Sequence, residues 1–160
     1  MRFIISSAFA GVTVAGLAVM SPEGTAAAAA DPPPRSVVSV KTPYGCLTNH
    51  SGPHASMRKC AQGSRTQQWV WTPGPDKSVL LRNVATGRCL DGDRTGSVYT
   101  SPCKSDNRYE QWRTSGPDNN KQFYSVGTGR YLRANAFNNL YTVVLGEGAL
   151  PTGFAVARVS

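Results

Sequence analysis

The sequence predicts an all-β protein built from three copies of one unit. A frame of cysteine and large apolar residues recurs at a fixed period. Short stretches typical of strands alternate with turn signals every eight to twelve residues, and no long apolar stripe with the 3.6-residue period of a helix occurs. One copy is too small to bury an apolar face alone. The three copies are therefore expected to close around a shared core, which also removes exposed strand edges.

The recurring frame is clearest between Gly87 and Trp112. It consists of a Cys-Leu pair, a second cysteine fourteen residues after the first, and a tryptophan nine residues after the second. The third copy has other apolar residues at these positions, and the three frames are Cys46-Leu47, Cys60 and Trp69; Cys89-Leu90, Cys103 and Trp112; and Tyr131-Leu132, Leu145 and Phe154. Their period of 42 to 43 residues predicts repeats at about 37–76, 77–118 and 119–160. The equivalent leucines and aromatic residues are expected to meet in the core.

Residues 1–30 have the pattern of a secretory signal peptide. Arg2 is followed by the apolar stretch Phe3–Met20, and the alanine run Ala26–Ala30 offers a cleavage site before Asp31. A transmembrane anchor is the weaker alternative, because the apolar stretch is short and rich in alanine and glycine. We therefore expect a secreted, extracellular protein without a membrane span.

The rest of the chain is expected to be a Pro-rich leader at 31–36 and one domain at 37–160. The leader, Asp31-Pro-Pro-Pro-Arg35, is stiff and extended, and it cannot continue a helix or a central strand. Strands are expected where apolar, β-branched and aromatic residues cluster: Val37–Val40, Gln67–Trp71, Ser78–Leu81, Val98–Ser101, Gln122–Val126 and Leu140–Leu145.

Turn residues mark equivalent places in successive repeats. Gly74-Pro-Asp76 recurs as Gly116-Pro-Asp118, and this composition is typical of a chain reversal between strands. A Thr-Gly-Arg tripeptide precedes the frame in the second and third repeats. Its glycines, Gly87 and Gly129, are expected in a turn that needs a positive φ.

All four cysteines lie in the first two repeats. In an exported protein an even number of cysteines implies disulfides, and four cysteines allow three connectivities. The repeat favours Cys46–Cys60 and Cys89–Cys103, which join equivalent positions within one repeat. Each bridge would stabilise the fold by roughly 3 kcal/mol in the chain-entropy model. A zinc site is the weaker alternative, because no C-x-x-C pair is present.

The formal net charge is +8, and loss of residues 1–30 leaves it unchanged, because one basic and one acidic residue are removed. Such a balance favours anionic partners such as wall polymers, acidic glycans or nucleic acid. The basic residues are nevertheless scattered, with no run of three, which is typical of a solvated surface. A nucleic-acid partner is therefore not favoured, and a monomer is expected.

The tripeptide Gln67-Gln68-Trp69 has the form Q-x-W. Together with the cysteine frame it resembles the ricin B-type lectins, which are β-trefoils of three Q-x-W repeats. Glu110-Gln111-Trp112 departs from the motif at its first residue, and Thr152-Gly153-Phe154 retains only an aromatic residue. The resemblance covers the chain from about Val37. It implies a β-trefoil with one disulfide or its remnant in each repeat, and it implies binding of galactose-type or other sugars in up to one shallow pocket per repeat.

In that family a carboxylate follows the Cys-Leu pair, an aromatic residue lies near the second cysteine, and Asn and Gln precede the tryptophan. The carboxylate accepts hydrogen bonds from sugar hydroxyls, and the aromatic face stacks on the sugar. The second repeat keeps most of this pattern. Its predicted sugar-binding residues are Asp91, Tyr99, Ser101, Asn107, Tyr109 and Glu110.

Several of these residues depart from the family pattern. Ser101 takes the usual aromatic place, but Tyr99 lies two residues earlier on the same strand face. Tyr109 stands where Asn is usual, and Glu110 replaces Gln. A glutamate accepts hydrogen bonds but, when ionised, cannot donate them as Gln does. The alternative, that Asp91 only holds its turn and Tyr99 only packs, stays open.

The first and third repeats are expected to be scaffold remnants without a sugar site. Thr48 and Arg133 stand at the acid position, and Arg58 and Val143 stand at the aromatic position. In the third repeat, Tyr141 is equivalent to Tyr99. Its loop also contains three asparagines that could bind a ligand but are equally typical of turns: Asn135, Asn138 and Asn139.

Catalysis is not expected. His50 and His54 flank Ser-Gly-Pro, which predicts a loop and not a helix that could present a metal-ligand pair. With the cysteines paired, few parts remain for a nucleophile and base, and no cofactor-binding motif is present. The favoured function is carbohydrate binding. The alternatives are a trefoil interaction protein such as a protease inhibitor or adhesin, and a basic module that binds anionic polymers. The sugar and the physiological partner stay open.

Overall fold

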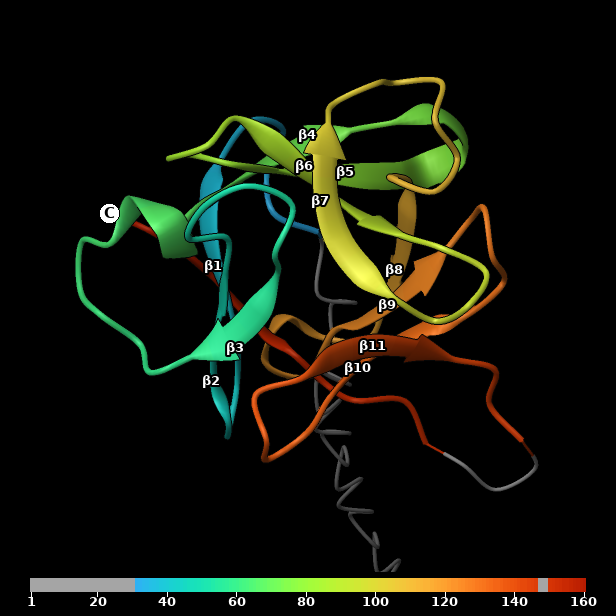
Figure 1. Cartoon of the computed structure of the whole chain (residues 1–160). Coiled ribbons are helices and arrows are strands. Elements are labelled where there is room, and N and C mark those ends of the chain that lie inside the picture. Colours follow the sequence, from blue (N-terminus) through green and yellow to red (C-terminus); the bar gives the residue numbers. More distant parts are fainter. Residues whose placement is uncertain (1–30, 147–149) are drawn as a thin grey trace, which may run out of the picture.

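The computed structural model of the chain describes residues 31–146 and 150–160, so the expected signal peptide lies outside the described residues. The strands form one antiparallel sheet (Figure 1). They are β1 (Val37–Thr42), β2 (Gly45–Thr48), β3 (Ser56–Arg58), β4 (Trp69–Pro73), β5 (Ser78–Asn83), β6 (Arg88–Gly92), β7 (Val98–Pro102), β8 (Trp112–Ser115), β9 (Gln122–Ser125), β10 (Tyr131–Ala134), β11 (Leu140–Val143) and β12 (Ala155–Arg158). The helical segments are three 3-10 turns: η1 (Arg65–Gln67), η2 (Pro75–Lys77) and η3 (Asp118–Asn120). In the described part of the chain, no helix has the length and apolar character needed to cross a membrane.

Half of these strands form a closed barrel. Pairing runs from β12 to β1, β4, β5, β8 and β9 in turn. Lys121 and Phe154, which precede β9 and β12, exchange two backbone hydrogen bonds of 2.8 Å and so close the ring. The other strands form the hairpins β2–β3, β6–β7 and β10–β11, one in each repeat. This is the β-trefoil that the resemblance implies, and the all-β prediction is confirmed.

The three sequence frames converge in the core. The framework leucine and aromatic residue of each repeat have no exposed surface: Leu47, Leu90, Leu132, Trp69, Trp112 and Phe154. In the first two repeats the indole N–H donates to the carbonyl of the framework leucine, at 2.9 Å for Trp69 and 3.0 Å for Trp112. Phe154 has no such donor. The third repeat therefore fills the same position with apolar surface alone, including an edge-to-face contact with Phe123.

Replacing Trp112 with Phe is expected to lower the free energy of unfolding by about 1–2 kcal/mol more than the same change at Trp71. Trp112→Phe leaves the buried Leu90 carbonyl without its donor. Trp71 is also buried, but its indole donates to no group in the described residues, so Trp71→Phe removes only apolar surface. Urea unfolding of both variants measures the difference, and equal losses would contradict the role of the indole bond.

Both expected disulfides are present. The Cys46–Cys60 and Cys89–Cys103 bridges have Cα–Cα distances of 5.1 and 4.9 Å. Each bridge joins the start of its hairpin to the chain that leaves it, and so holds the following loop beside the hairpin. The predicted connectivity is therefore confirmed.

The expected strands and turns form, although β9 ends at Ser125 and β11 ends at Val143, slightly earlier than expected, and a further difference lies near the site. Gly87 and Gly129 have φ values of +69° and +71°, as expected. Gln67, expected in a strand, instead ends the 3-10 turn η1, because its backbone N–H donates to the Ser64 carbonyl at 3.0 Å. The turn directs the Gln67 side chain back toward the hairpin of its repeat, where it makes three hydrogen bonds.

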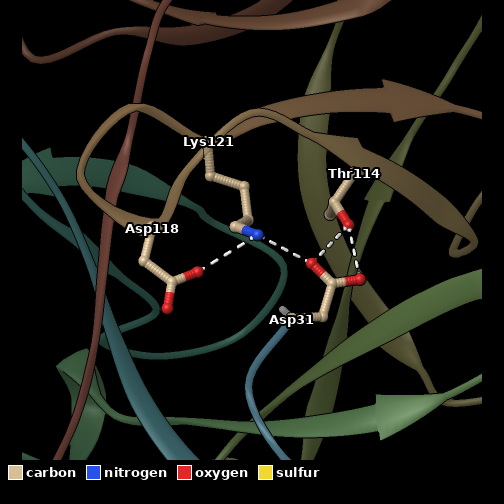
Figure 2. A network of polar contacts seen from close by, with 4 residues as sticks. All are labelled: Asp31, Thr114, Asp118 and Lys121. Atoms are coloured by element: carbon tan, nitrogen blue, oxygen red, sulfur yellow. Dashed lines mark hydrogen bonds and ion pairs between the residues drawn. The ribbon is translucent and has the colours of Figure 1, made fainter. Parts of the chain in front are cut away.

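The leader packs against the barrel and is held there by Asp31 (Figure 2). The Asp31 carboxylate lies 2.7 Å from Lys121 Nζ and accepts a hydrogen bond from Thr114 Oγ1 at 3.0 Å. Lys121 is only 1% exposed and also lies 3.1 Å from Asp118. Burial alone would lower the pKa of Lys121, but the two carboxylates outweigh it and hold the pKa above 10.5. The stiff, extended leader that the sequence predicts is thus tied to the packed domain through Asp31.

Candidate functional site

The structure brings all six predicted sugar-binding residues of the second repeat together. Asp91 lies on β6 and faces its register partner Tyr99 on β7, with Ser101 two residues further along the same strand. Asn107 and Glu110 come from the loop between β7 and β8, which the Cys89–Cys103 bridge holds beside the hairpin. The polar residues of this group form one hydrogen-bonded cluster.

Two carboxyl groups share the same donors in this cluster. Ser101 Oγ lies 2.8 Å from Asp91 Oδ2 and 2.7 Å from Glu110 Oε1. Asn107 Nδ2 lies 3.3 Å and 3.0 Å from the same two oxygens. The Asn107 amide has two hydrogens and can donate to both carboxylates, whereas the Ser101 hydroxyl has one hydrogen and can donate to only one at a time. The site therefore has more acceptors than the protein supplies with donors.

The acceptor atom that lacks a donor belongs to Asp91. Its side chain is 3% exposed, and its Oδ1 atom is buried without a donor among the described residues. Burial raises the pKa of Asp91 above 3.8 and the nearby charge of Glu110 raises it further, while the hydrogen bonds from Ser101 and Asn107 to Oδ2 oppose the shift. A buried acceptor without a partner costs about 1–3 kcal/mol. The structure thus leaves one carboxylate oxygen in need of a hydrogen-bond donor.

Two tyrosines flank the carboxyl groups. On β7, the half-buried Tyr99 and Ser101 alternate with the buried Val98 and Thr100, which confirms that Tyr99 and Ser101 share one face. Burial raises the pKa of Tyr99, and the charges of Asp91, Asp93 and Glu110 raise it further. Tyr109 is half-buried, and its backbone N–H donates to Asn107 Oδ1 at 3.1 Å. The site thus combines carboxylate acceptors with aromatic side chains.

Gln67 of the first repeat, which is equivalent to Glu110, makes hydrogen bonds both as an acceptor and as a donor. There, Gln67 Oε1 accepts the backbone N–H of Ala61 at 2.8 Å, and Glu110 Oε2 accepts the equivalent N–H of Lys104 at the same distance. Gln67 Nε2 also donates to Thr48 Oγ1 at 3.2 Å, at the position equivalent to Asp91. Glu110 keeps the oxygen that accepts the backbone N–H, but its carboxylate has no N–H group to donate to Asp91. This is the physical reason that Asp91 and Glu110 compete for the same donors.

The other two repeats have no acid at this position. Thr48 is buried, and its hydroxyl donates to the Cys46 carbonyl. Arg133 is a donor in the third repeat, and its Nη1 atom lies 3.2 Å from the Leu150 carbonyl. A carboxylate acceptor beside the hairpin therefore distinguishes the second repeat from its two siblings.

The remaining chemical groups of the described chain do not assemble a second centre of this kind. His54 pairs with Tyr99 through the backbone, and its carbonyl accepts a hydrogen bond from Asn49. Glu110 lies close to the sulfur atoms of Cys89 and Cys103, but both sulfurs are in the disulfide and offer no thiolate to a metal. The Asp91 and Glu110 carboxyls share a hydroxyl, whereas glycoside hydrolysis needs two acids on opposite sides of a cleft.

Comparisons with known proteins agree with this architecture. A family model described as the ricin-type beta-trefoil lectin domain matches residues 34–145. A comparison with curated protein sequences found no match.

Among solved structures, a GlcNAcα1-4Gal-releasing endo-β-galactosidase from Clostridium perfringens is 14% identical, with a TM-score of 0.67, over 78% of this chain and 33% of that chain. The cytolethal distending toxin of Haemophilus ducreyi is 15% identical, with a TM-score of 0.64, over 77% of this chain and 83% of that chain. The designed three-fold symmetric protein ThreeFoil is 15% identical, with a TM-score of 0.61, over 77% of this chain and 99% of that chain. At these identities the likeness concerns the fold.

Proposed function

The chain belongs to the ricin-type β-trefoil lectin family, and from that premise we propose that it is a secreted, non-catalytic carbohydrate-binding module. Its sugar site lies mainly in the second repeat, and the ligand is a galactose-type or other sugar. The residues proposed to form the site are Asp91, Tyr99, Ser101, Asn107, Tyr109 and Glu110. Family membership supports carbohydrate binding in general, and the geometry of the second repeat supports the choice of this repeat.

The observation that carries the proposal is the unpartnered Oδ1 atom of Asp91. A sugar hydroxyl is a hydrogen-bond donor, so its arrival would supply the bond that the protein lacks. A hydroxyl can reach Oδ1 only after a side chain above it turns aside, because Asp91 is 3% exposed. The half-buried Tyr99 and Tyr109 are the groups proposed to move, and their rings then offer an apolar face to the sugar.

The remaining polar groups have supporting roles. Ser101 and Asn107 hold Asp91 Oδ2, so the carboxylate keeps its orientation while Oδ1 accepts from the ligand. Glu110 anchors the loop through the backbone N–H of Lys104. A single shallow site of this kind should bind weakly, with a Kd near 1 mM, which corresponds to roughly −4 kcal/mol. Several copies of the sugar along a polymer would strengthen retention through avidity.

Replacing Asp91 with Asn is expected to lower the affinity for the bound sugar at least about tenfold, because a charge-assisted hydrogen bond is lost. A glycan array that includes wall polysaccharides selects the sugar, and calorimetry measures the loss. Asp106→Asn is the matched control, because it makes the same charge change at an exposed residue of the β7–β8 loop that is not among the proposed site residues. In the wild type, binding should also strengthen as the pH rises through the raised pKa of Asp91, since the ionised form is the acceptor.

Two outcomes would refute this site. If Asp91→Asn bound sugar as well as the wild type, the second repeat would not be the binding repeat. If retention instead fell steeply with salt and ignored both the sugar and the Asp91 substitution, attraction of anionic polymers to the +8 chain would explain the binding.

A further inference from the structure

The three hairpin loops meet at one end of the trefoil and are joined by a repeated hydrogen bond. In each repeat, a backbone N–H of the hairpin's second strand donates to a loop carbonyl of a neighbouring repeat. The three bonds are Thr100 to Pro53 at 2.7 Å, Thr142 to Gly96 at 2.8 Å and Met57 to Asn138 at 3.0 Å. These three bonds fix the loops relative to one another, so side chains on loops of different repeats keep fixed relative positions.

One of these three hairpin loops displays an exposed aromatic residue. The loops of the second and third repeats have the same construction: Oδ1 of Asp93 or Asn135 accepts the backbone N–H groups two and four residues further on, at 2.9 to 3.2 Å. Thr95 and Phe137 occupy equivalent places in the two loops. Phe137 is 82% exposed. An aromatic side chain held out on an ordered loop offers a binding face at a small entropic cost.

A depression of about 650 Å³ lies between these loops and receives residues from all three repeats. Its polar lining includes Ser56, Ser97, Asn135, Asn138, Asn139 and Tyr141. Within residues 31–146 and 150–160, the side-chain amides of Asn138 and Asn139 and the Tyr141 hydroxyl make no hydrogen bond. Phe137 lies in the same loop, between the lining residues Asn135 and Asn138. The depression thus combines unused donors and acceptors with the Tyr141 ring in its lining, while Phe137 stands outside the lining on the same loop.

The lining points to an uncharged ligand. None of the residues that line the depression is charged, although the chain as a whole carries +8. Such a surface does not attract an anion, but amide and hydroxyl groups beside an aromatic ring match the hydroxyls and the C–H face of a neutral sugar. The residues equivalent to Phe137 are Thr95 in the second repeat and Gly52 in the first. Among the three hairpin loops, an aromatic side chain therefore stands at this position in the third repeat alone.

Strand β7 connects the lining of this depression with the second-repeat site. Ser97, Tyr99 and Ser101 alternate with buried residues and so share one face, and Ser97 pairs through the backbone with Tyr141 of the third repeat. Ser101 lies four residues after Ser97, which is about 13 Å along an extended chain. A row of hydroxyl and aromatic side chains therefore links the two places.

We propose that the depression between the hairpin loops is a second saccharide site, which takes an inner residue of an uncharged glycan chain whose other end occupies the second-repeat site. Phe137 stacks on the sugar, and Asn138, Asn139 and Tyr141 bond its hydroxyls. The inference rests on the proposed carbohydrate-binding function and narrows its ligand from a single sugar to a neutral chain several residues long.

The test is a titration of the ¹⁵N-labelled protein with galactose and with β-1,4-galactan fragments of two to six residues. Galactose should shift signals around Asp91 only. The longer fragments should also shift the side-chain amide signals of Asn138 and Asn139 and bind about tenfold more tightly than galactose. Phe137→Ala should lower the affinity for the hexasaccharide about 5- to 10-fold and leave galactose binding unchanged.

Two further variants sharpen the result. Asn138→Gly removes the amide but keeps the positive φ, as Gly96 does in the second repeat, and should also weaken only the longer fragments. Val144→Ala, which trims an exposed apolar residue away from the depression, should change nothing. Shifts confined to the surroundings of Asp91 with every fragment would overturn this inference alone. No shift at either place would overturn the proposed galactose-type function as well.

Discussion

Replacing Asp31 and Asp118 together with Asn is expected to lower the free energy of unfolding by about 3–4 kcal/mol, as removal of the partners of a buried charge does. The double variant leaves the Lys121 ammonium, which is 1% exposed, without a counter-charge. Either single variant should cost less, about 1–2 kcal/mol, because the other carboxylate remains and both acids are nearly half exposed. Guanidinium unfolding measures all three losses (Figure 2 shows the contacts).

A third substitution distinguishes a buried charge from a packing defect. Lys121→Met in the double variant removes the charge and keeps the apolar stem, so it should recover most of the lost stability. The pH dependence of the free energy of unfolding should also reverse between the wild type and the double variant. In the wild type the raised pKa of Lys121 contributes stability that is present below 10.5 and lost as the pH rises through the folded-state pKa.

In the double variant burial acts alone and lowers the pKa of Lys121, so stability should rise as Lys121 loses its proton. If Lys121→Met failed to rescue the double variant, the lost stability would come from a packing defect and not from the unpaired Lys121 charge.

Replacing Glu110 with Gln is expected to raise the free energy of unfolding at neutral pH by about 2 kcal/mol, the usual contribution of a hydrogen bond to a charged group. The change keeps the acceptor for the Lys104 N–H and adds a donor in the cluster around Asp91. It also removes the charge that helps to raise the pKa of Asp91. The first repeat already uses Gln at this position and satisfies its neighbours.

The pH profile identifies the cause of this gain. Because the pKa of Asp91 is raised in the fold, the stability linked to its proton is complete below 3.8 and is lost as the pH rises through the folded-state pKa. Glu110→Gln should make that loss smaller. The difference in free energy of unfolding between the variant and the wild type should therefore grow as the pH rises. The reverse change, Gln67→Glu, is the matched control and should destabilise the first repeat, since it removes the donor to Thr48. A gain of equal size at every pH would rule out relief of Asp91 as its source.

The sequence predicts the fold well because the fold repeats. The fourteen- and nine-residue spacings identify equivalent residues directly, and the two disulfides and the buried framework leucines lie where equivalence requires them. The positive φ of Gly87 and Gly129 follows from the same logic, because each turn is made by a few neighbouring residues. Gln67 is the exception: strand propensity places it in β4, whereas its side-chain bonds to the hairpin favour the 3-10 turn.

The sequence predicts which residues gather around Asp91, but not how they are arranged. Asp91 stands out because its siblings in the other repeats are Thr48 and Arg133. That its carboxyl lies beneath Ser101 and shares that hydroxyl with Glu110 depends on how a loop folds back over a hairpin, and no spacing records this.

By itself, then, the sequence determined the repeat, the strand-rich architecture and the disulfide partners, and it singled out Asp91 as an acid that the other two repeats lack at the equivalent position. Each of these depends on residues close together in the chain or at equivalent places in successive copies. The tertiary structure alone decided that Asp31 meets Lys121 across ninety positions, and that loops of three repeats enclose one uncharged depression. The physical reason is closure of the barrel: contacts between repeats form only when all strands are in place, so no local pattern of residues encodes them.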